Sequence, residues 1–182
     1  MKNYASLIVA CASLIAGCSG PPTTDAQKDA LTARVQSAIA EVKRDDPTIS
    51  KFFDTSAGYA VLPSVGKGGF IVSGAGGDGA LFHNGTLSGY CSMGQGSIGL
   101  TAGGQAFDEF IFFKDEAAYR QFVTGEWALA AQVSAVMVQA GGAAAADYQG
   151  GVAVFINSLQ GAMVEASVGG QKFTYHPLDA GK

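Results

Sequence analysis

Charge is the scarcest property of this sequence. Only 14% of the 182 residues are charged, well below the quarter or so that is usual for soluble domains. The 11 lysine and arginine residues are outnumbered by 15 aspartate and glutamate residues, and the net charge is −4. Nucleic acid is recognised by a basic face, so we expect no nucleic-acid partner.

Histidine and cysteine are also rare. His83 and His176 have no neighbouring histidine, cysteine or carboxylate at metal-ligand spacing, so we expect surface histidines and no metal or other cofactor. Cys11 and Cys18 lie at the N-terminal end, which leaves Cys91 alone in the body of the chain. No internal disulfide is therefore expected, and Cys91 is interpreted as a small buried strand residue rather than a nucleophile.

A long hydrophobic run is missing as well. The apolar stretch from Ala5 to Ala16 follows Lys2 and is too short for a stable membrane-spanning helix. It ends in Leu14-Ile15-Ala16-Gly17-Cys18, which resembles the lipobox of bacterial lipoproteins, in which the cysteine accepts the lipid. The alternative is an ordinary secretory signal with an incidental cysteine.

The lipobox interpretation predicts a processed and anchored protein. Residues 1–17 are the signal peptide, 18–24 are a tether, and Cys18 is the site of lipid attachment, with palmitate among the acyl groups. Ser19 after the cysteine, in place of aspartate, resembles the Gram-negative signal for the outer membrane. We therefore expect a lipid-anchored protein of the outer membrane that faces the periplasm.

Glycine is abundant, with 26 residues, and together with many Val, Ile and Phe it favours a β-rich core. One helix is expected after Thr24, because Leu31, Val35, Ile39 and Val42 fall on one helical face. It should end near Asp46, before Pro47. Its apolar stripe packs on the domain or, alternatively, lies on a bilayer.

Further elements follow in order. Residues Pro47–Phe53 predict one or two more helical turns, Asp115–Val123 a helix that stops at Gly125, and His83-Asn84-Gly85 a hairpin turn. Residues 126–140 are ambiguous between helix and strand, and Gln132–Gln139 favours strand. The expected strands are Gly58–Leu62, Gly69–Ser73, Gly79–Phe82, Thr86–Gly89, Ser97–Thr101, Phe107–Phe113, Val152–Ile156, Met163–Ser167 and Lys172–Tyr175.

These elements predict a single α+β domain over residues 25–182. Its core is a curled or partly closed, mainly antiparallel β-sheet, with the N-terminal amphipathic helix and one or two further short helices. A weak internal echo, Gly103–Phe107 with Gly169–Phe173, is consistent with a sheet that curls on itself.

No enzymatic constellation is found. Gly74–Gly79 matches G-x-G-x-x-G but runs into a hairpin and not into the helix that a dinucleotide site needs. The adjacent carboxylates Asp108 and Glu109 point to opposite faces of a strand and are interpreted as solvated charge, while Asp115 and Glu116 are interpreted as helix-start charge. We expect a protein that is not an enzyme; a hydrolase is a minority alternative.

Several motifs resemble the SYLF domain family. The first runs from Phe52-Phe53 through Gly58–Phe70, a stretch that carries Tyr-Ala-Val-Leu-Pro-Ser-Val-Gly-Lys-Gly-Gly-Phe. It is followed in order by Ile98-Gly99-Leu100, Gly103-Gly104-Gln105, Phe110–Phe113, Ala145–Tyr148 and Gly169–Phe173. The resemblance covers about residues 27 to 176.

The resemblance implies a lipid-binding domain of the bacterial lipoprotein type. Eukaryotic members bind phosphoinositides and some fungal ones bind actin, but actin is not expected in this compartment. The candidate lipid-binding residues are Lys67 with its flanking glycines Gly66, Gly68 and Gly69, and Lys172. Membrane phospholipids, bound through the headgroup or the acyl chains, are the expected partners. The alternative is a structural or stress lipoprotein that contacts an envelope protein through the apolar segment Gly141–Ala146.

Overall fold

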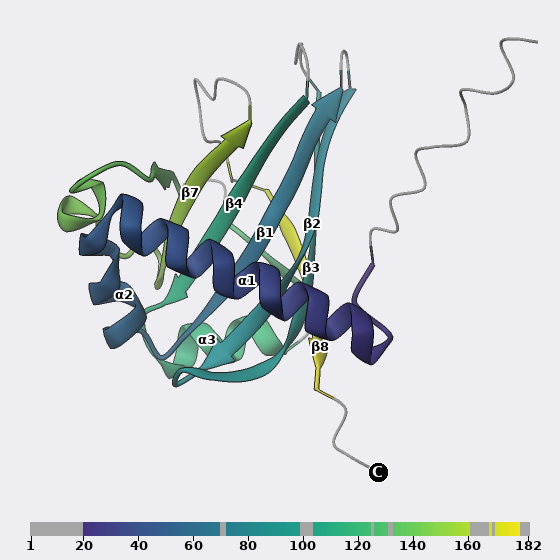
Figure 1. Ribbon diagram of the computed structural model, residues 1–182, viewed down its shortest axis with the longest axis horizontal. Helices are drawn as coiled ribbons and strands as arrows, with labels where there is room; N and C mark the ends of the chain where they lie inside the picture. The colour runs from purple at the N-terminus through teal and green to yellow at the C-terminus, as the bar shows by residue number, and fades with distance from the viewer. Residues whose placement is uncertain are drawn as a thin grey trace, which may run out of the picture.

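Figure 1 shows the computed structural model, which describes residues 20–69, 72–98, 104–124, 126–130, 133–160, 168 and 170–178. The helices are α1 (Asp25–Asp45), η2 (Pro47–Ile49), α2 (Ser50–Thr55), α3 (Glu116–Val123) and η3 (Gly142–Ala145). The strands are β1 (Gly58–Gly69), β2 (Val72–His83), β3 (Thr86–Ile98), β4 (Gly104–Phe113), β5 (Glu126–Ala128), β6 (Ala135–Met137), β7 (Val152–Gln160) and β8 (Lys172–Pro177).

Local chemistry sets the ends of α1. Thr24 and Gln27 form a capping box, in which the Thr24 side chain accepts from the Gln27 amide and the Gln27 side chain accepts from the Thr24 amide. Asp46 takes an extended conformation before Pro47, and the chain restarts in η2 and α2. The predicted end of the first helix and the short helical segment after it are confirmed.

The strands form one eight-stranded sheet with the order β5-β8-β3-β2-β1-β4-β7-β6. Every pairing is antiparallel except β6 with β7. The β2–β3 turn has positive φ at Asn84 (48°) and Gly85 (77°), as the Asn-Gly signal predicts. The expected α+β fold is confirmed.

The sheet must curl, because its two edge strands are close in sequence: β5 ends at Ala128 and β6 begins at Ala135. Eight strands at about 4.8 Å spacing span about 34 Å when flat. Seven residue steps reach only about 25 Å when fully extended. Leu129 and Val133 are both buried in the core on one face of the sheet, so the sheet wraps around that face.

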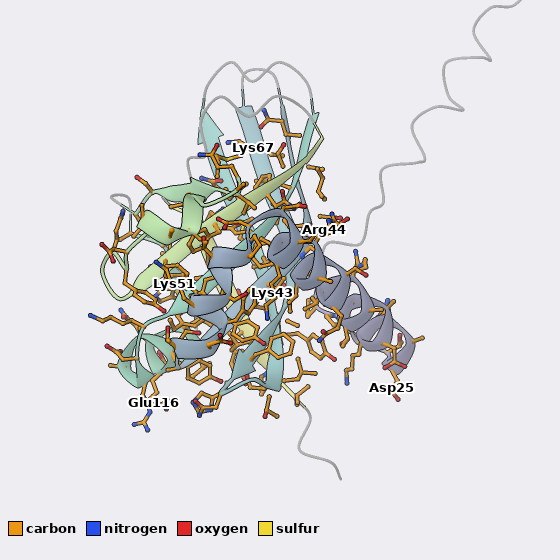
Figure 2. The ribbon with its side chains drawn as sticks, turned by 60° about the vertical axis from the view of Figure 1, so that its left-hand side comes forward. Asp25, Lys43, Arg44, Lys51, Lys67 and Glu116 are labelled. Carbon is orange, nitrogen blue, oxygen red and sulfur yellow. The ribbon has the colours of Figure 1, made fainter. Side chains whose placement is uncertain are left out.

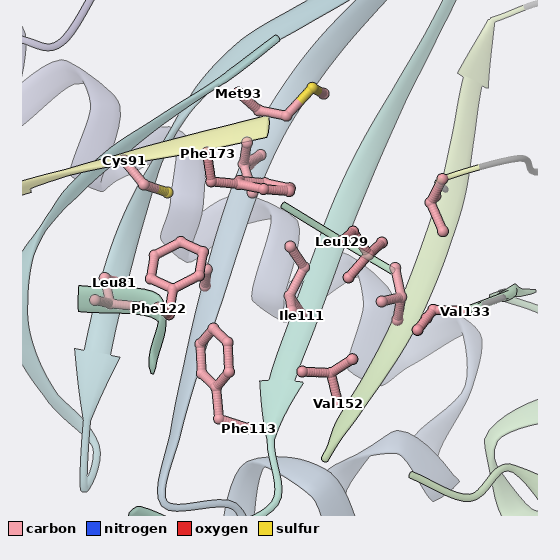
Figure 3. Packing of buried hydrophobic residues seen from close by; sticks show 14 of the residues in the cluster. Leu81, Cys91, Met93, Ile111, Phe113, Phe122, Leu129, Val133, Val152 and Phe173 are labelled. Carbon is pink, nitrogen blue, oxygen red and sulfur yellow. The ribbon is translucent and has the colours of Figure 1, made fainter. Parts of the chain in front are cut away.

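Two cores lie on the two faces of the sheet. The face that packs against α1, called the α1 face below, buries Leu31, Val35 and Val42 against Val61 and Phe110, among others. α1 crosses this face diagonally, and the far ends of β1, β2 and β4 extend beyond the helix (Figure 1). The opposite face holds the second core, from which Leu81, Cys91, Ile111, Phe113, Phe122 and Phe173 are drawn in Figure 3.

Most strands extend further than the sequence predicted. Gly69 and Ser73 were expected in one strand, but they pair with each other across β1 and β2. Gly66, Gly68, Gly74 and Gly76 were expected to lie between strands, yet they continue β1 and β2, because ladder hydrogen bonds hold the backbone whatever the side chain. The predicted strand Ser97–Thr101 is confirmed over Ser97 and Ile98, which belong to β3. Its remainder and the predicted strand Met163–Ser167 lie outside the described residues.

The ambiguous region 126–140 contains two short strands, β5 and β6, and no helix among its described residues. The preference for strand was therefore correct over Ala135–Met137. α3 begins at the Asp115 cap, whose side chain accepts from the Ala118 amide, as the sequence predicts. No helix within the described ranges is long and apolar enough to cross a membrane.

Candidate functional site

A bulge in β1 shapes the α1 face where the helix ceases to cover it. The register of β1 shifts between Leu62 and Val65 against β4, and also shifts against β2. Within the bulge, Ser64 has a positive φ of 61°, which is uncommon for a residue other than glycine. Its amide donates a 2.9 Å hydrogen bond to Oδ1 of Asp108 on β4. The bulge therefore depends on a carboxylate from the neighbouring strand.

Asp108 is buried on this face, with 3% of its surface exposed. Among the described residues, its hydrogen-bond partner is the Ser64 amide, which donates to Oδ1. Burial raises the pKa of Asp108, the Ser64 hydrogen bond offsets part of this effect, and the negative charge of Glu41 on α1 adds to the rise. The second oxygen, Oδ2, receives no hydrogen bond in the part of the chain described, and it is not among the fully buried atoms that lack a partner, so it is open to solvent.

Asp108 lies in the wall of a pocket of about 300 Å³ between α1 and the bulge. The wall combines charged, hydroxyl and apolar groups. It consists of Ala33, Arg34, Ser37, Ala38 and Glu41 from α1, Pro63 and Ser64 from β1, Asp108 from β4 and Leu159 from β7.

The candidate residues from the sequence are divided between the two faces. The pairing register aligns Gly66, Gly76, Gly94 and Lys172 across β1, β2, β3 and β8. Side chains alternate along a strand, so the positions of Gly66, Gly68 and Lys172 belong to the α1 face. Lys67 belongs to the opposite face, with Val65. Figure 2 shows Lys67 toward the end of the sheet that lies away from Glu116.

A second pocket, of about 480 Å³, adjoins Lys172. Its wall includes Asp78, Ser92, Gly94, Lys172 and Thr174. Asp78 accepts a 2.8 Å hydrogen bond from the Ser92 hydroxyl and a 3.4 Å hydrogen bond from the amide of Gly20. The tether that follows position 18 therefore meets the domain on the α1 face, beside this pocket.

The opposite face buries a polar pair that the sequence did not predict. Glu109 is fully buried, and its Oε2 accepts a 3.0 Å hydrogen bond from Nε2 of the buried Gln171. Within the described ranges, neither Glu109 Oε1 nor Gln171 Oε1 has a hydrogen-bond partner. Burial raises the pKa of Glu109 to about 8, and the Gln171 hydrogen bond offsets part of the rise.

The interpretation of Asp108 and Glu109 as solvated charge was therefore wrong. They do point to opposite faces, as predicted, but both faces of β4 are covered. The signal was present in the sequence Phe107-Asp108-Glu109-Phe110-Ile111-Phe112-Phe113. A continuous apolar run on both sides of a carboxylate pair indicates a strand buried on both faces.

The other candidates for chemistry have structural roles. Cys91 is buried, and burial raises the pKa of its thiol far above the usual range. The negative charges of Asp78 and Glu109 raise this pKa further. His83 stacks on Tyr119 and lies 2.8 Å from Glu116. His176 is half-buried beside Ser92, at 3.4 Å. No group of metal-ligating side chains is found in the described ranges.

The apolar segment Gly141–Ala146 is tied to its own chain. Asp46 accepts from the amides of Gly141 and Ala143, and Lys51 Nζ donates to the carbonyls of Ala144 and Ala146. Ala143 is buried. These contacts engage much of the segment that had been considered as an interface with another protein.

Comparison with known proteins gives one distant relationship. No family model matches the chain. Beta cell expansion factor A of Aeromonas veronii is 24% identical over 153 residues, which cover 84% of this chain and 59% of that protein. The chain thus corresponds to somewhat more than half of this relative. The relative is a bacterial SYLF-domain protein, so the similarity agrees in part with the resemblance of the sequence motifs.

Proposed function

We propose that this chain is a SYLF-type lipoprotein of the outer membrane, anchored through Cys18, which binds phospholipids on the α1 face of its sheet. The observation that carries the proposal is the pocket between α1 and the β1 bulge. Its wall combines charged and hydroxyl groups with apolar ones, among them Leu159, an exposed leucine of β7. A phospholipid has the same division between a charged headgroup and apolar chains.

The surface beyond the pocket supports acyl contact. Gly66 follows the bulge on the α1 face, and Gly94 lies two strands away in the same row. A Cβ atom at either position would meet no atom within 4 Å, so neither close packing nor positive φ requires glycine there. The result is a low surface of paired backbone, on which an extended chain can lie without displacing side chains.

The position of the tether supports the anchor. Gly20 contacts Asp78 on the same face, and position 18 is two residues earlier, within about 7 Å of extended chain. An acylated Cys18 would therefore hold the α1 face close to the bilayer, where phospholipids are available to the pocket.

The anchor is tested by intact-mass measurement of detergent-extracted protein. Acylation is expected at Cys18 and should vanish in Cys18→Ser. Lipid binding is tested with the mature chain carrying Cys18→Ser, by sedimentation with phospholipid vesicles. Absence of binding to every vesicle composition would contradict the proposed lipid-binding function. Lys67→Glu tests the sequence-based site: because Lys67 faces away from the pocket, this change is expected to leave binding intact.

A further inference from the structure

The environment of the Asp108 carboxylate favours the binding of a cation. Most of its side chain is buried, which is costly for a charge unless a partner is supplied, and only Oδ2 remains open to the pocket. The Ser64 amide satisfies one oxygen, and none of the ion pairs among the described residues involves the Asp108 carboxylate. The unpartnered oxygen belongs to a side chain in the wall of the α1–bulge pocket, where a ligand has access to it.

The pocket also contains a second carboxylate and two hydroxyl groups, which favour a cation that carries hydrogen-bond donors. Glu41 lines the same pocket, and its only ion pair among the described residues is a long one, 3.8 Å to Arg44. Ser37 and Ser64 contribute hydroxyl groups to the wall. A primary ammonium group carries three N–H donors, which matches a carboxylate oxygen flanked by hydroxyls and a second carboxylate.

The same pocket also contains a cation of its own. Arg34 lines it from α1, seven residues before Glu41, which corresponds to about 10 Å along the helix. A guanidinium group is a preferred partner of phosphate. Acidic groups and one basic group within a single pocket suit a zwitterion better than a simple cation.

We infer that the α1–bulge pocket binds the ethanolamine headgroup of a phospholipid, with the ammonium group on Asp108 and the phosphate at Arg34. This inference rests on the proposed phospholipid-binding function and assigns its headgroup class. Leu159 and the bare backbone beyond Ser64 then receive the first part of the acyl chains. A choline headgroup has the same phosphate but no N–H donor, and a glycerol headgroup has no positive charge, so neither satisfies Asp108.

The test compares vesicles that differ only in the headgroup. The mature chain with Cys18→Ser is titrated with vesicles of phosphatidylcholine alone, and with equal mixtures of phosphatidylcholine with phosphatidylethanolamine or phosphatidylglycerol. Binding is measured by sedimentation. We expect the ethanolamine vesicles to bind roughly tenfold more tightly than choline vesicles, which is the effect of one hydrogen bond to a charged group.

Two variants assign the preference to the pocket. Asp108→Asn keeps an acceptor for the Ser64 amide and is expected to reduce the ethanolamine preference to within about twofold, while Arg34→Gln should weaken binding to all three vesicles together. Glu41→Gln, on the helix surface, repeats the Asp108 test with a substitution that leaves the bulge intact. Asp147→Asn removes one exposed charge elsewhere and should change nothing.

The outcomes separate the inference from the function on which it rests. Equal binding to ethanolamine and choline vesicles overturns the headgroup assignment and leaves phospholipid binding standing. A preference that survives in both Asp108→Asn and Glu41→Gln also overturns it, since the ammonium site is then elsewhere. Absence of binding to all vesicles overturns both proposals.

Discussion

The amide of Ala143 donates a 2.7 Å hydrogen bond to Oδ2 of Asp46, 97 residues earlier in the chain. Asp46 also accepts from the Gly141 amide and from the amide and hydroxyl of Thr48. One buried carboxylate therefore fixes the end of α1, the start of η2 and the entry to η3.

Replacing Asp46 with alanine is expected to destabilise the protein by about 3 kcal/mol, because buried amides lose their acceptor. Urea unfolding measures this change. Asp45→Ala is the matched control: Asp45 is exposed and forms an ion pair with its neighbour Arg44, so its effect should stay within about 0.5 kcal/mol. Equal effects of the two substitutions would contradict the role of Asp46.

Asp46 should also make the protein sensitive to acid. Burial alone would raise its pKa, but hydrogen bonds from Thr48, Ala143 and Gly141 outweigh burial and leave the pKa lowered. The stabilising contribution of a group with a lowered pKa is present above the unfolded-state value and is lost as the pH falls through the folded-state value. We expect this loss below about pH 4, and Asp46→Asn should remove that part of the acid dependence.

Glu109 is expected to give the opposite dependence of stability on pH. Its pKa is raised to about 8 in the folded state, so its contribution to stability is greatest below the unfolded-state pKa of about 4.3 and is lost as the pH rises through about 8. The free energy of unfolding should decline over this window by up to about 1.4 kcal/mol per pH unit. Glu109→Gln should flatten the decline; a slope equal to that of the parent protein would rule out Glu109 as its source.

Cys91 should be unreactive in the folded protein. Its side chain is buried and burial raises the pKa of the thiol, whereas the reactive species is the thiolate. In the Cys18→Ser mature chain, thiol modification should follow the fraction unfolded in a urea titration. Rapid modification without denaturant would contradict the buried placement.

The glycines of the strands should fall into two classes. Gly94→Ala places a methyl group in open space, so stability should be unchanged or rise by up to about 1 kcal/mol. Gly79→Ala places Cβ 2.5 Å from the Val61 carbonyl oxygen and should destabilise the protein by more than 1 kcal/mol. Thermal unfolding compares the two. A similar loss at both positions would mean that Gly94 is required for the fold.

The sequence predicted the helices well because their signals are local. The Thr24 cap, the Leu31–Val42 stripe and Pro47 lie within one helix or at its ends. The hairpin at Asn84-Gly85 was predictable for the same reason. The strand lengths were not, since the glycines of β1, β2 and β3 are held by pairing with one another, which sequence spacing does not reveal.

The candidate site was predicted only in part. Gly66, Gly68 and Lys172 do belong to one face, but this follows from a register across four strands. The bulge at Ser64 turns Lys67 to the other face and leaves Asp108 under α1. That arrangement depends on contacts between residues 44 positions apart, and no local pattern encodes it.

The two edges of the sheet are short. β5 and β6, the outermost strands, have three residues each, against 9 to 13 in β1, β2, β3, β4 and β7. Long unpaired edges act as templates for pairing between molecules. Because this glycine-rich, weakly charged sheet ends in two such short strands, each outermost strand offers a neighbouring molecule little backbone to pair with, which disfavours the growth of fibres from these strands.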